Sequence, residues 1–352
     1  MWFVFGLAAA ICFGIRGILY QWTSQRKVNR GALLFGVYLS GMLVATLMNM
    51  AMGQKWTDGA WWGVLMGGFS FVANASMYKG YAVGKASLIA LLTGLPPLVV
   101  ALGALVLWGE TLGFGQLAGF AIVLSGLIAI RYSSDLRIGQ LHGLIWGLLT
   151  LFFFGFTDLT SKQSTISGAE TLPTLILMYA TGTLLFAGQW LLGSLSSSRT
   201  RREIAASATE TAVTTETASA TETAVTTETA SATETAATTK TASPTETAVS
   251  ITAAASEAHK QTSAVLPVAS AWTTKRTVVW GMTVGLTNIA GMMFLIPAFQ
   301  EGSTGIVSAL GAMNAAIVLA YAKFYLKEEM RRAEAIGMAL ALGGIVVMRL
   351  AS

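Results

Sequence analysis

Residues 86–131 read ASLIALLTGLPPLVVALGALVLWGETLGFGQLAGFAIVLSGLIAIR, and the only charged residues among them are Glu110 and Arg131. Glu110 divides the stretch into two apolar runs, 86–109 and 111–130. The hydrocarbon core of a bilayer is about 30 Å thick and needs about 20 apolar helical residues to cross it. The stretch therefore predicts two consecutive transmembrane helices joined by a short turn.

Apolar runs of similar length recur along the chain, which has 352 residues, 54% of them hydrophobic and 11% charged. Soluble domains are about a quarter charged, so this composition is not that of an ordinary soluble protein. In lipid, a helix satisfies every backbone hydrogen bond within one segment. We therefore predict an all-α integral membrane fold with ten transmembrane helices. Their expected ranges are 1–22, 31–54, 59–78, 86–109, 111–130, 138–157, 171–198, 277–300, 302–322 and 335–348.

The two halves of the chain match each other at two constant offsets. The first offset aligns Tyr38 with Tyr179, and the second, longer offset aligns Glu110 with Glu328. The first offset also pairs Gly41 with Gly182, and the second pairs Gly84 with Gly302, Gly119 with Gly337, Gly126 with Gly344 and Arg131 with Arg349. Because each half holds an odd number of spans, the second half must enter the membrane from the opposite side. Such inverted repeats are typical of secondary transporters, whose substrate sites lie near the membrane midplane.

The extra length that separates the two offsets falls at about 195–271. Within it, residues 209–250 repeat a hexapeptide of Thr-Glu-Thr-Ala and a variable pair, with Lys240 in place of one Glu. Large apolar side chains are too few here to offset the entropy of folding. We therefore predict a disordered linker over 195–271. The first repeat is expected at 1–134, and the second at 135–194 and 272–352.

Basic residues are distributed unequally between the two sides of this topology. We call the side of residue 1 side A and the opposite side side B. Of the 22 Lys and Arg residues, all but four fall on side B. The four are Lys55, Lys162 and Arg349 on side A, and Arg16 within a span. Because cytoplasmic loops carry the excess of Lys and Arg, we predict a protein of the cell membrane with 195–271 inside and both termini outside.

Residues 78–131 carry a further pattern, which includes Gly-Lys-Ala-Ser, Leu-Pro-Pro and Leu-Trp-Gly-Glu. Its spacing resembles the EamA-type repeat of the drug/metabolite transporter superfamily, and the matching positions are Gly84, Pro97, Glu110 and Gly119. The second half matches at Gly302, Glu328 and Gly337, and departs at Ala315 and Lys327. The resemblance covers the chain outside the linker and implies a ten-helix carrier of small organic metabolites. It also implies that both termini lie inside, which is opposite to the orientation that the charges predict.

Two charged residues are predicted inside spans, where an ionised side chain is expensive. Arg16 lies about 6 Å from the midplane by helical rise. It would bind an anionic group such as a carboxylate, or extend toward the side-B interface. Asp158 would bind substrate or carry a coupling proton, or pair with Lys162 one helical turn away. The inverted arrangement places Arg16 and Asp158 on opposite sides of the midplane, so we expect no direct ion pair between them.

Five uncharged residues complete the predicted substrate-binding set, and they are Asn74, Tyr78, Thr93, Asn288 and Asn314. The three asparagines fall near the centres of spans, where amides either bind a ligand or hold helices together. Pro96 and Pro97 predict a kink in the fourth span, and their counterparts in the second half are Asn314 and Ala315. Glu110 is expected beside the N-terminus of the helix that follows it.

These features predict a secondary transporter that moves a small polar organic metabolite, amino-acid-like or another organic solute, by alternating access. A membrane-embedded enzyme and a channel are the alternatives. An enzyme would need a catalytic cluster, which Cys12, His142 and His259 do not supply at their spacing, and a channel would need rings of charge or carbonyl groups. Arg16 in an acid-free first span argues against a cationic drug. We expect no catalytic residue, metal, cofactor or nucleic acid. The expected partners are a small-molecule substrate and the lipid bilayer, and the sequence leaves the oligomeric state open.

Overall fold

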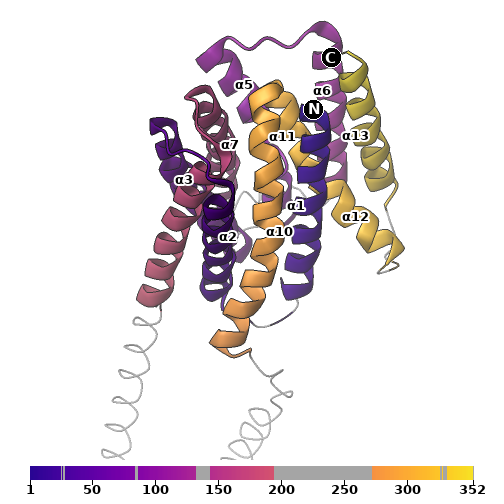
Figure 1. The fold of residues 1–352 in the computed structure, drawn as a ribbon. Helices are drawn as coiled ribbons and strands as arrows, with labels where there is room; N and C mark the ends of the chain where they lie inside the picture. Colours follow the sequence, from indigo (N-terminus) through magenta and orange to yellow (C-terminus); the bar gives the residue numbers. More distant parts are fainter. Residues whose placement is uncertain are drawn as a thin grey trace, which may run out of the picture. The chain divides into compact units, whose positions relative to one another are not determined.

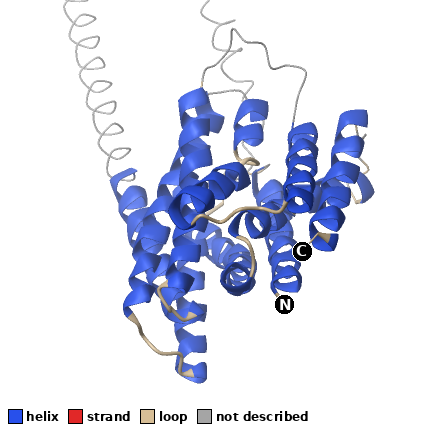
Figure 2. Cartoon of the chain, turned by 90° about the horizontal axis from the view of Figure 1, so that it is seen from above, coloured by secondary structure: helices blue, strands red, loops and turns tan. Residues whose placement is uncertain are grey.

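The computed structural model describes residues 1–24, 26, 28–83, 86–131, 143–193, 272–325, 327 and 331–351. Every regular element in these ranges is a helix (Figure 2), which confirms the predicted all-α class for this part of the chain. Residues 1–190 and 272–352 form one compact unit, to which the description below refers. The predicted linker, 195–271, lies outside the described residues.

The helices follow the predicted spans in order (Figure 1). They are α1 (Trp2–Ser24), α2 (Arg30–Met52), the 3-10 turn η1 (Asp58–Trp61), α3 (Trp62–Val83), α4 (Ala86–Leu92), α5 (Pro96–Trp108), α6 (Phe114–Arg131), α7 (Leu144–Ile166), the helix Thr171–Gly193, α10 (Thr274–Glu301), α11 (Thr304–Ala312), α12 (Asn314–Phe324) and α13 (Arg332–Leu350). In the described part, eight helical segments are long and apolar enough to cross a membrane. The spans predicted at α3 and at the shorter α6 stay predictions.

The helix α7 extends beyond its predicted range, 138–157, to Ile166. The predicted range stops before the charged residue Asp158, whereas the helix continues through turns that are rich in Ser and Thr. Their hydroxyls donate to carbonyls one turn back, as in the bonds from Thr157 to Phe153 and from Thr160 to Phe156. Such bonds satisfy a hydroxyl without a water molecule. Asp158 and Lys162 therefore both lie on α7.

Two spans are interrupted at equivalent positions. The fourth divides into α4 and α5, with Pro96 as the first residue of α5 and Leu95 before it. The ninth divides into α11 and α12 at Met313, which the second offset aligns with Leu95. The second break has no proline, so the kink predicted from Pro96 and Pro97 has a counterpart that the sequence did not indicate. A break in these two helices frees backbone groups within the span.

Glycines bring the backbones of neighbouring helices together, and the contacts recur at the repeat offsets. A Cβ on Gly281 of α10 would overlap the carbonyl oxygen of Leu33 on α2. A Cβ on Gly63 of α3 would overlap that of Thr174 on Thr171–Gly193. The second offset relates Gly63 to Gly281, and the first relates Leu33 to Thr174. Two further pairs follow the same rule, Gly67 with Met178 and Gly285 with Val37.

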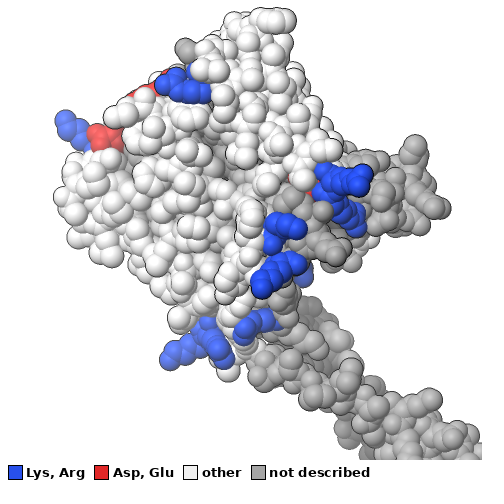
Figure 3. All heavy atoms as spheres, turned by 90° about the vertical axis from the view of Figure 1, so that its right-hand side faces the viewer, with Lys and Arg blue, Asp and Glu red and all other residues white. Residues whose placement is uncertain are grey.

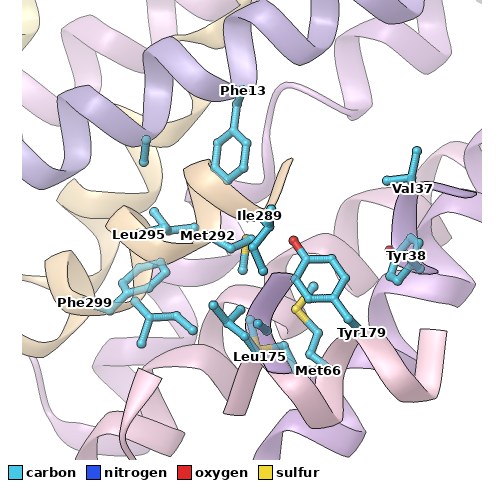
Figure 4. Close-up of a cluster of buried hydrophobic side chains, with 14 of the residues drawn as sticks. Phe13, Val37, Tyr38, Met66, Leu175, Tyr179, Ile289, Met292, Leu295 and Phe299 are labelled. Carbon is cyan, nitrogen blue, oxygen red and sulfur yellow. The ribbon is translucent and has the colours of Figure 1, made fainter. Parts of the chain in front are cut away.

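A reciprocal contact joins α2 to Thr171–Gly193. The ring of Tyr179 packs on Gly41, and the ring of Tyr38 packs on Gly182. The two rings meet edge to face with centroids 5.7 Å apart. Figure 4 shows Tyr179 within the buried apolar cluster, close to Met66. The helices α6 and α13, which lie side by side in Figure 1, cross in the same reciprocal way through Gly119 with Gly344 and Gly126 with Gly337.

We predict that Gly281→Ala destabilises the protein because a methyl group cannot fit against the Leu33 carbonyl. Overpacking of this kind costs about 1–3 kcal/mol. The measurement is thermal unfolding of the purified protein in detergent, with Gly63→Ala as the equivalent change in the other half. Gly68→Ala is the control, because a Cβ there has no neighbour within 4 Å. Equal melting temperatures for Gly281→Ala and Gly68→Ala would contradict the packing described.

Candidate functional site

A cavity of about 1430 Å³ lies among the helices of the unit. All seven residues predicted from the sequence line it, and they are Arg16, Asn74, Tyr78, Thr93, Asp158, Asn288 and Asn314. Nine further polar residues, not predicted, line it as well: Tyr20, Thr23, Arg26, Arg30, Tyr38, Ser70, Tyr81, Thr157 and Ser308. The interruptions before α5 and α12 also border the cavity, because Pro96 and Ala312 belong to its wall. The structure therefore brings the predicted residues to one place.

The cavity extends toward side B and not toward side A. On side B its wall includes Arg26 and Arg30, both of which are exposed. At the side-A ends of the described helices, the terminal turn contributes no residue to the cavity wall. The wall on α1, for example, begins at Phe13, the fourth turn from the side-A end. Among the described residues, the cavity wall thus reaches the end of the unit at side B and not at side A.

Arg16 is held inside the cavity by a hydrogen bond to Asn288. One of its terminal nitrogens donates to the Asn288 side-chain oxygen, and its guanidinium lies 4.7 Å from the centre of the Phe13 ring. Asn288, which is buried, donates its amide nitrogen to the Tyr179 hydroxyl at 3.0 Å. The alternative in which Arg16 extends to the interface is therefore not adopted. A guanidinium fixed on two sides still presents N–H groups to a ligand.

The first half contains a related but uncharged network. The Tyr38 hydroxyl shares a hydrogen bond with the Ser70 hydroxyl, and the Asn74 amide donates to the Ser70 carbonyl at 2.8 Å. The second offset aligns Ser70 with Asn288, so the two Tyr networks correspond. Asn74 thus bonds within its own helix while it lines the cavity. The Ser70 position could have been found in the sequence only through its alignment with Asn288.

Asp158 pairs with a serine and not with a cation. Its carboxylate accepts a hydrogen bond of 2.6 Å from the Ser308 hydroxyl on α11. The predicted pair with Lys162 is wrong, because Lys162 points to another carboxylate, that of Glu110. As expected, Arg16 and Asp158 form no ion pair in the described residues. Asp158 therefore faces the cavity as a hydrogen-bond acceptor.

The three remaining predicted residues, Tyr78, Thr93 and Asn314, line other parts of the cavity wall. The Arg30 guanidinium lies 5.3 Å from the centre of the Tyr78 ring, so Tyr78 supports a cation at the entrance. The Thr93 hydroxyl donates to the Ala90 carbonyl at 2.9 Å, at the end of α4. Asn314 is the first residue of α12, beside the interruption. These three side chains and Arg16 therefore border one cavity.

A second polar cluster lies beyond the cavity toward side A. The Lys162 ammonium lies 3.5 Å from the Glu110 carboxylate and donates to the Phe299 carbonyl at 2.7 Å. Glu110 accepts hydrogen bonds from the Thr304 backbone N–H at 2.9 Å and from its hydroxyl at 2.8 Å. Glu110 therefore caps α11 and not α6, the helix that follows it, so that expectation is wrong. None of Lys162, Glu110 and Thr304 lines the cavity.

Comparisons with known proteins agree with this architecture. Residues 1–132 match the EamA-like transporter family, which confirms the resemblance predicted from the sequence over that part of the chain. A solved crystal structure is similar over 100% of this chain and 99% of its own, with a TM-score of 0.65 and 14% identity, and this likeness concerns the fold alone. No curated protein matches the sequence. The chain is thus a multi-pass membrane protein with an EamA-like transporter segment.

We predict that Arg16→Ala weakens the binding of small carboxylates far more than the binding of their neutral amide analogues. A charge-assisted hydrogen bond contributes about 1.5–3 kcal/mol, so the loss should be on the order of 10- to 100-fold. The measurement is a thermal-shift titration of the purified protein with matched acid and amide pairs. Arg332→Ala, an exposed change that leaves the cavity wall untouched, is the control. Equal loss for acids and amides would remove Arg16 from the binding of anions.

Proposed function

We propose that this chain, whose first 132 residues match the EamA-like transporter family, is a secondary transporter that moves a small polar organic metabolite by alternating access. The observation that carries the proposal is the large cavity with polar residues in its wall, which among the described residues reaches one side of the unit and ends before the other. A carrier needs a central site that is exposed to one side at a time.

The second support is the recurrence of contacts between the halves. Gly14 on α1 packs against Ile317 on α12, and Gly155 on α7 packs against Val99 on α5. The first offset relates the two glycines, and the second relates their partners. If a two-fold axis relates the two halves, each contact between a glycine of one half and a residue of the other has a counterpart with the halves exchanged. We therefore propose two inverted repeats, 1–134 and 135–194 with 272–352, and alternating access through exchange of their conformations.

The third support is the charge in the cavity. Arg16 offers a cation and Asp158 an acceptor, on different helices and without an ion pair between them. A ligand with a carboxylate and an amino or hydroxyl group would satisfy both. An amino-acid-like solute has that chemistry, whereas a purely cationic drug would be repelled by the positive charge of Arg16. We assign Arg16 and Asn288 to the anionic end of the substrate and Asp158 to the donor end.

The barrier toward side A consists of two polar contacts between α7 and α11, one above the other along the helices. We call the pair the ladder and each contact a rung. The inner rung is the bond from Ser308 to Asp158, at the cavity wall. The outer rung, one helical turn away on both helices, joins Lys162 and Thr304 through Glu110. At the repeat offsets the sequence places Gly17, Gln21, Ala86 and Ala90 opposite Asp158, Lys162, Thr304 and Ser308. The equivalent ladder at side B would therefore lack its lysine and its serine, which favours a resting state that is closed at side A.

The charge distribution supports side B as the cytoplasmic side of the cell membrane. On the face shown in Figure 3, the Lys and Arg side chains gather mainly in the lower part, and a smaller group of mixed charge lies near the top. The excess of Lys and Arg marks the cytoplasmic side in most membrane proteins. In this orientation the cavity is open to the cytoplasm, and the ladder closes it to the outside.

We predict saturable exchange in proteoliposomes that contain the purified full chain. Vesicles loaded with an unlabelled amino acid or hydroxy acid should accumulate the labelled compound transiently, because a carrier returns faster when it is loaded. A flux that rises linearly with concentration would indicate a channel, and consumption of the solute would indicate an enzyme. Either result would overturn the proposal. Arg16→Ala should reduce the flux of acids more than that of amides.

We predict that Glu110→Gln opens the cavity to side A. The reporter is Gly311→Cys in a Cys12→Ser background, because a Cβ at this cavity-wall position meets only an ordinary contact at 3.7 Å. Labelling of intact cells with an impermeant thiol reagent should rise several-fold, since a lost charge-assisted contact shifts such equilibria by about 1–3 kcal/mol. Glu301→Gln is the matched control, because Glu301 pairs with the Met1 amino group at the same side but is 47% exposed. An equal rise in both variants would contradict the gate.

A further inference from the structure

Three tryptophans and two arginines gather where α1 ends and α10 begins. The Arg26 guanidinium lies 3.7 Å from the centre of the Trp22 ring and 5.3 Å from that of Trp272. The Arg276 guanidinium lies 4.5 Å from the centre of the same Trp272 ring. Trp280 packs on Trp22 with centroids 4.7 Å apart. These five residues, the Trp–Arg cluster, span two helices that lie side by side (Figure 1).

The tryptophans are fixed in position by the fold. The Trp280 indole donates a hydrogen bond of 2.8 Å to the Thr23 hydroxyl, which joins the side-B end of α1 to α10. Trp272 meets both other rings edge to face, at 5.9 Å from Trp22 and 6.0 Å from Trp280. The rings therefore form a rigid support on which the two guanidinium groups rest.

Both arginines have unused hydrogen-bonding capacity toward an anion. Each is exposed, and each rests on a ring face, so its N–H edge stays open. In the part of the chain that the structure describes, neither forms an ion pair with Asp or Glu. Arg26 follows the end of α1 and Arg276 lies in the first turn of α10, and both contact the Trp272 ring. Two forked donors that share one ring fit an anion such as a phosphate group, which accepts bidentate bonds from arginine.

An exposed apolar strip continues from the cluster along both helices. On α1 it includes Ile15 at 43% exposure and Ile11 at 47%, which with Trp22 follow the spacing of one helix face. On α10 it includes Val279 at 56% and Leu286 at 51%, which lie on one face with Arg276. Acyl chains would cover this strip while a headgroup meets the arginines. A free phosphate ion would leave the strip uncovered.

We propose that the Trp–Arg cluster is a binding site for the headgroup of one anionic phospholipid in the side-B leaflet. Tryptophans at this depth match the interfacial belt of membrane proteins, and the cytoplasmic leaflet is the one rich in anionic lipid. Because Arg26 also belongs to the cavity wall, the bound headgroup lies at the rim of the cavity. The site requires that the chain spans a bilayer but not that it transports a solute.

Native mass spectrometry of the purified full chain with added phosphatidylglycerol or phosphatidylcholine tests the site. We expect phosphatidylglycerol to bind and phosphatidylcholine to bind much more weakly. The double variant Arg26→Gln/Arg276→Gln should lower the affinity for phosphatidylglycerol on the order of tenfold or more. Trp272→Leu, which keeps both charges and removes their shared support, should cause a smaller loss. Both arginines are exposed, so the variants should fold as the parent does.

The matched control is Lys323→Gln/Arg332→Gln, which removes two exposed charges from side B away from the cluster. Equal losses in the control and in the double variant would show only a diffuse attraction to negative lipid and would overturn the proposal. An unchanged affinity in the double variant would do the same. Displacement of the lipid by an equal concentration of inorganic phosphate would assign the arginines to a soluble anion and would also overturn it. Failure of the flux experiment would leave each of these readouts unaffected, so the two proposals are judged separately.

Discussion

The close approach of helix backbones at glycine is the interaction on which the rest of this structure depends. In lipid, burial of apolar surface adds little to helix association, because the acyl chains are as apolar as the side chains. Helices are held by van der Waals contact, which is strongest where no side chain separates them. Gly281 and Gly63 bring α10 and α3 against carbonyl groups of their neighbours. A cavity with polar residues in its wall lies among the helices that such contacts hold together.

That cavity is where the halves differ from each other. The tyrosines at the α2 crossing have equivalent partners, but Ser70 occupies one position and Asn288 the other. The longer amide of Asn288 reaches Arg16 on the neighbouring helix, which a serine hydroxyl could not do at the same distance. An almost symmetric framework thus holds Arg16 in the cavity wall. The asymmetry lies in a few side chains, while the backbone contacts stay paired.

The sequence alone predicted much of this arrangement, because its strongest signals are physical requirements. Charge-free runs, glycines at constant offsets and polar residues in apolar surroundings each have few explanations in lipid. Arg16 and Asp158 therefore stood out, and both line the cavity. What it could not predict depends on contacts between distant segments. Lys162 has Asp158 one turn away in the sequence, yet its carboxylate partner is Glu110 on another segment.

Other features left no local signal. Met313 interrupts a span without proline or glycine at that position, so the break follows from tertiary packing and not from residue preference. The Trp–Arg cluster joins the end of the first helix to a helix near the other end of the chain, and each tryptophan alone is ordinary near a membrane surface. Ser308 is one of many serines, and only the fold places it opposite Asp158. Propensity and spacing cannot distinguish such residues from their neighbours.

The reciprocal seating of Tyr38 on Gly182 and of Tyr179 on Gly41 has a consequence for the cavity wall. A larger residue at either glycine would strike a ring that belongs to the other half. A substitution at either glycine would therefore be tolerated only together with a smaller residue in place of the ring that faces it. Because Tyr38 also lines the cavity, this pairing limits which side chains the cavity wall can carry at that position.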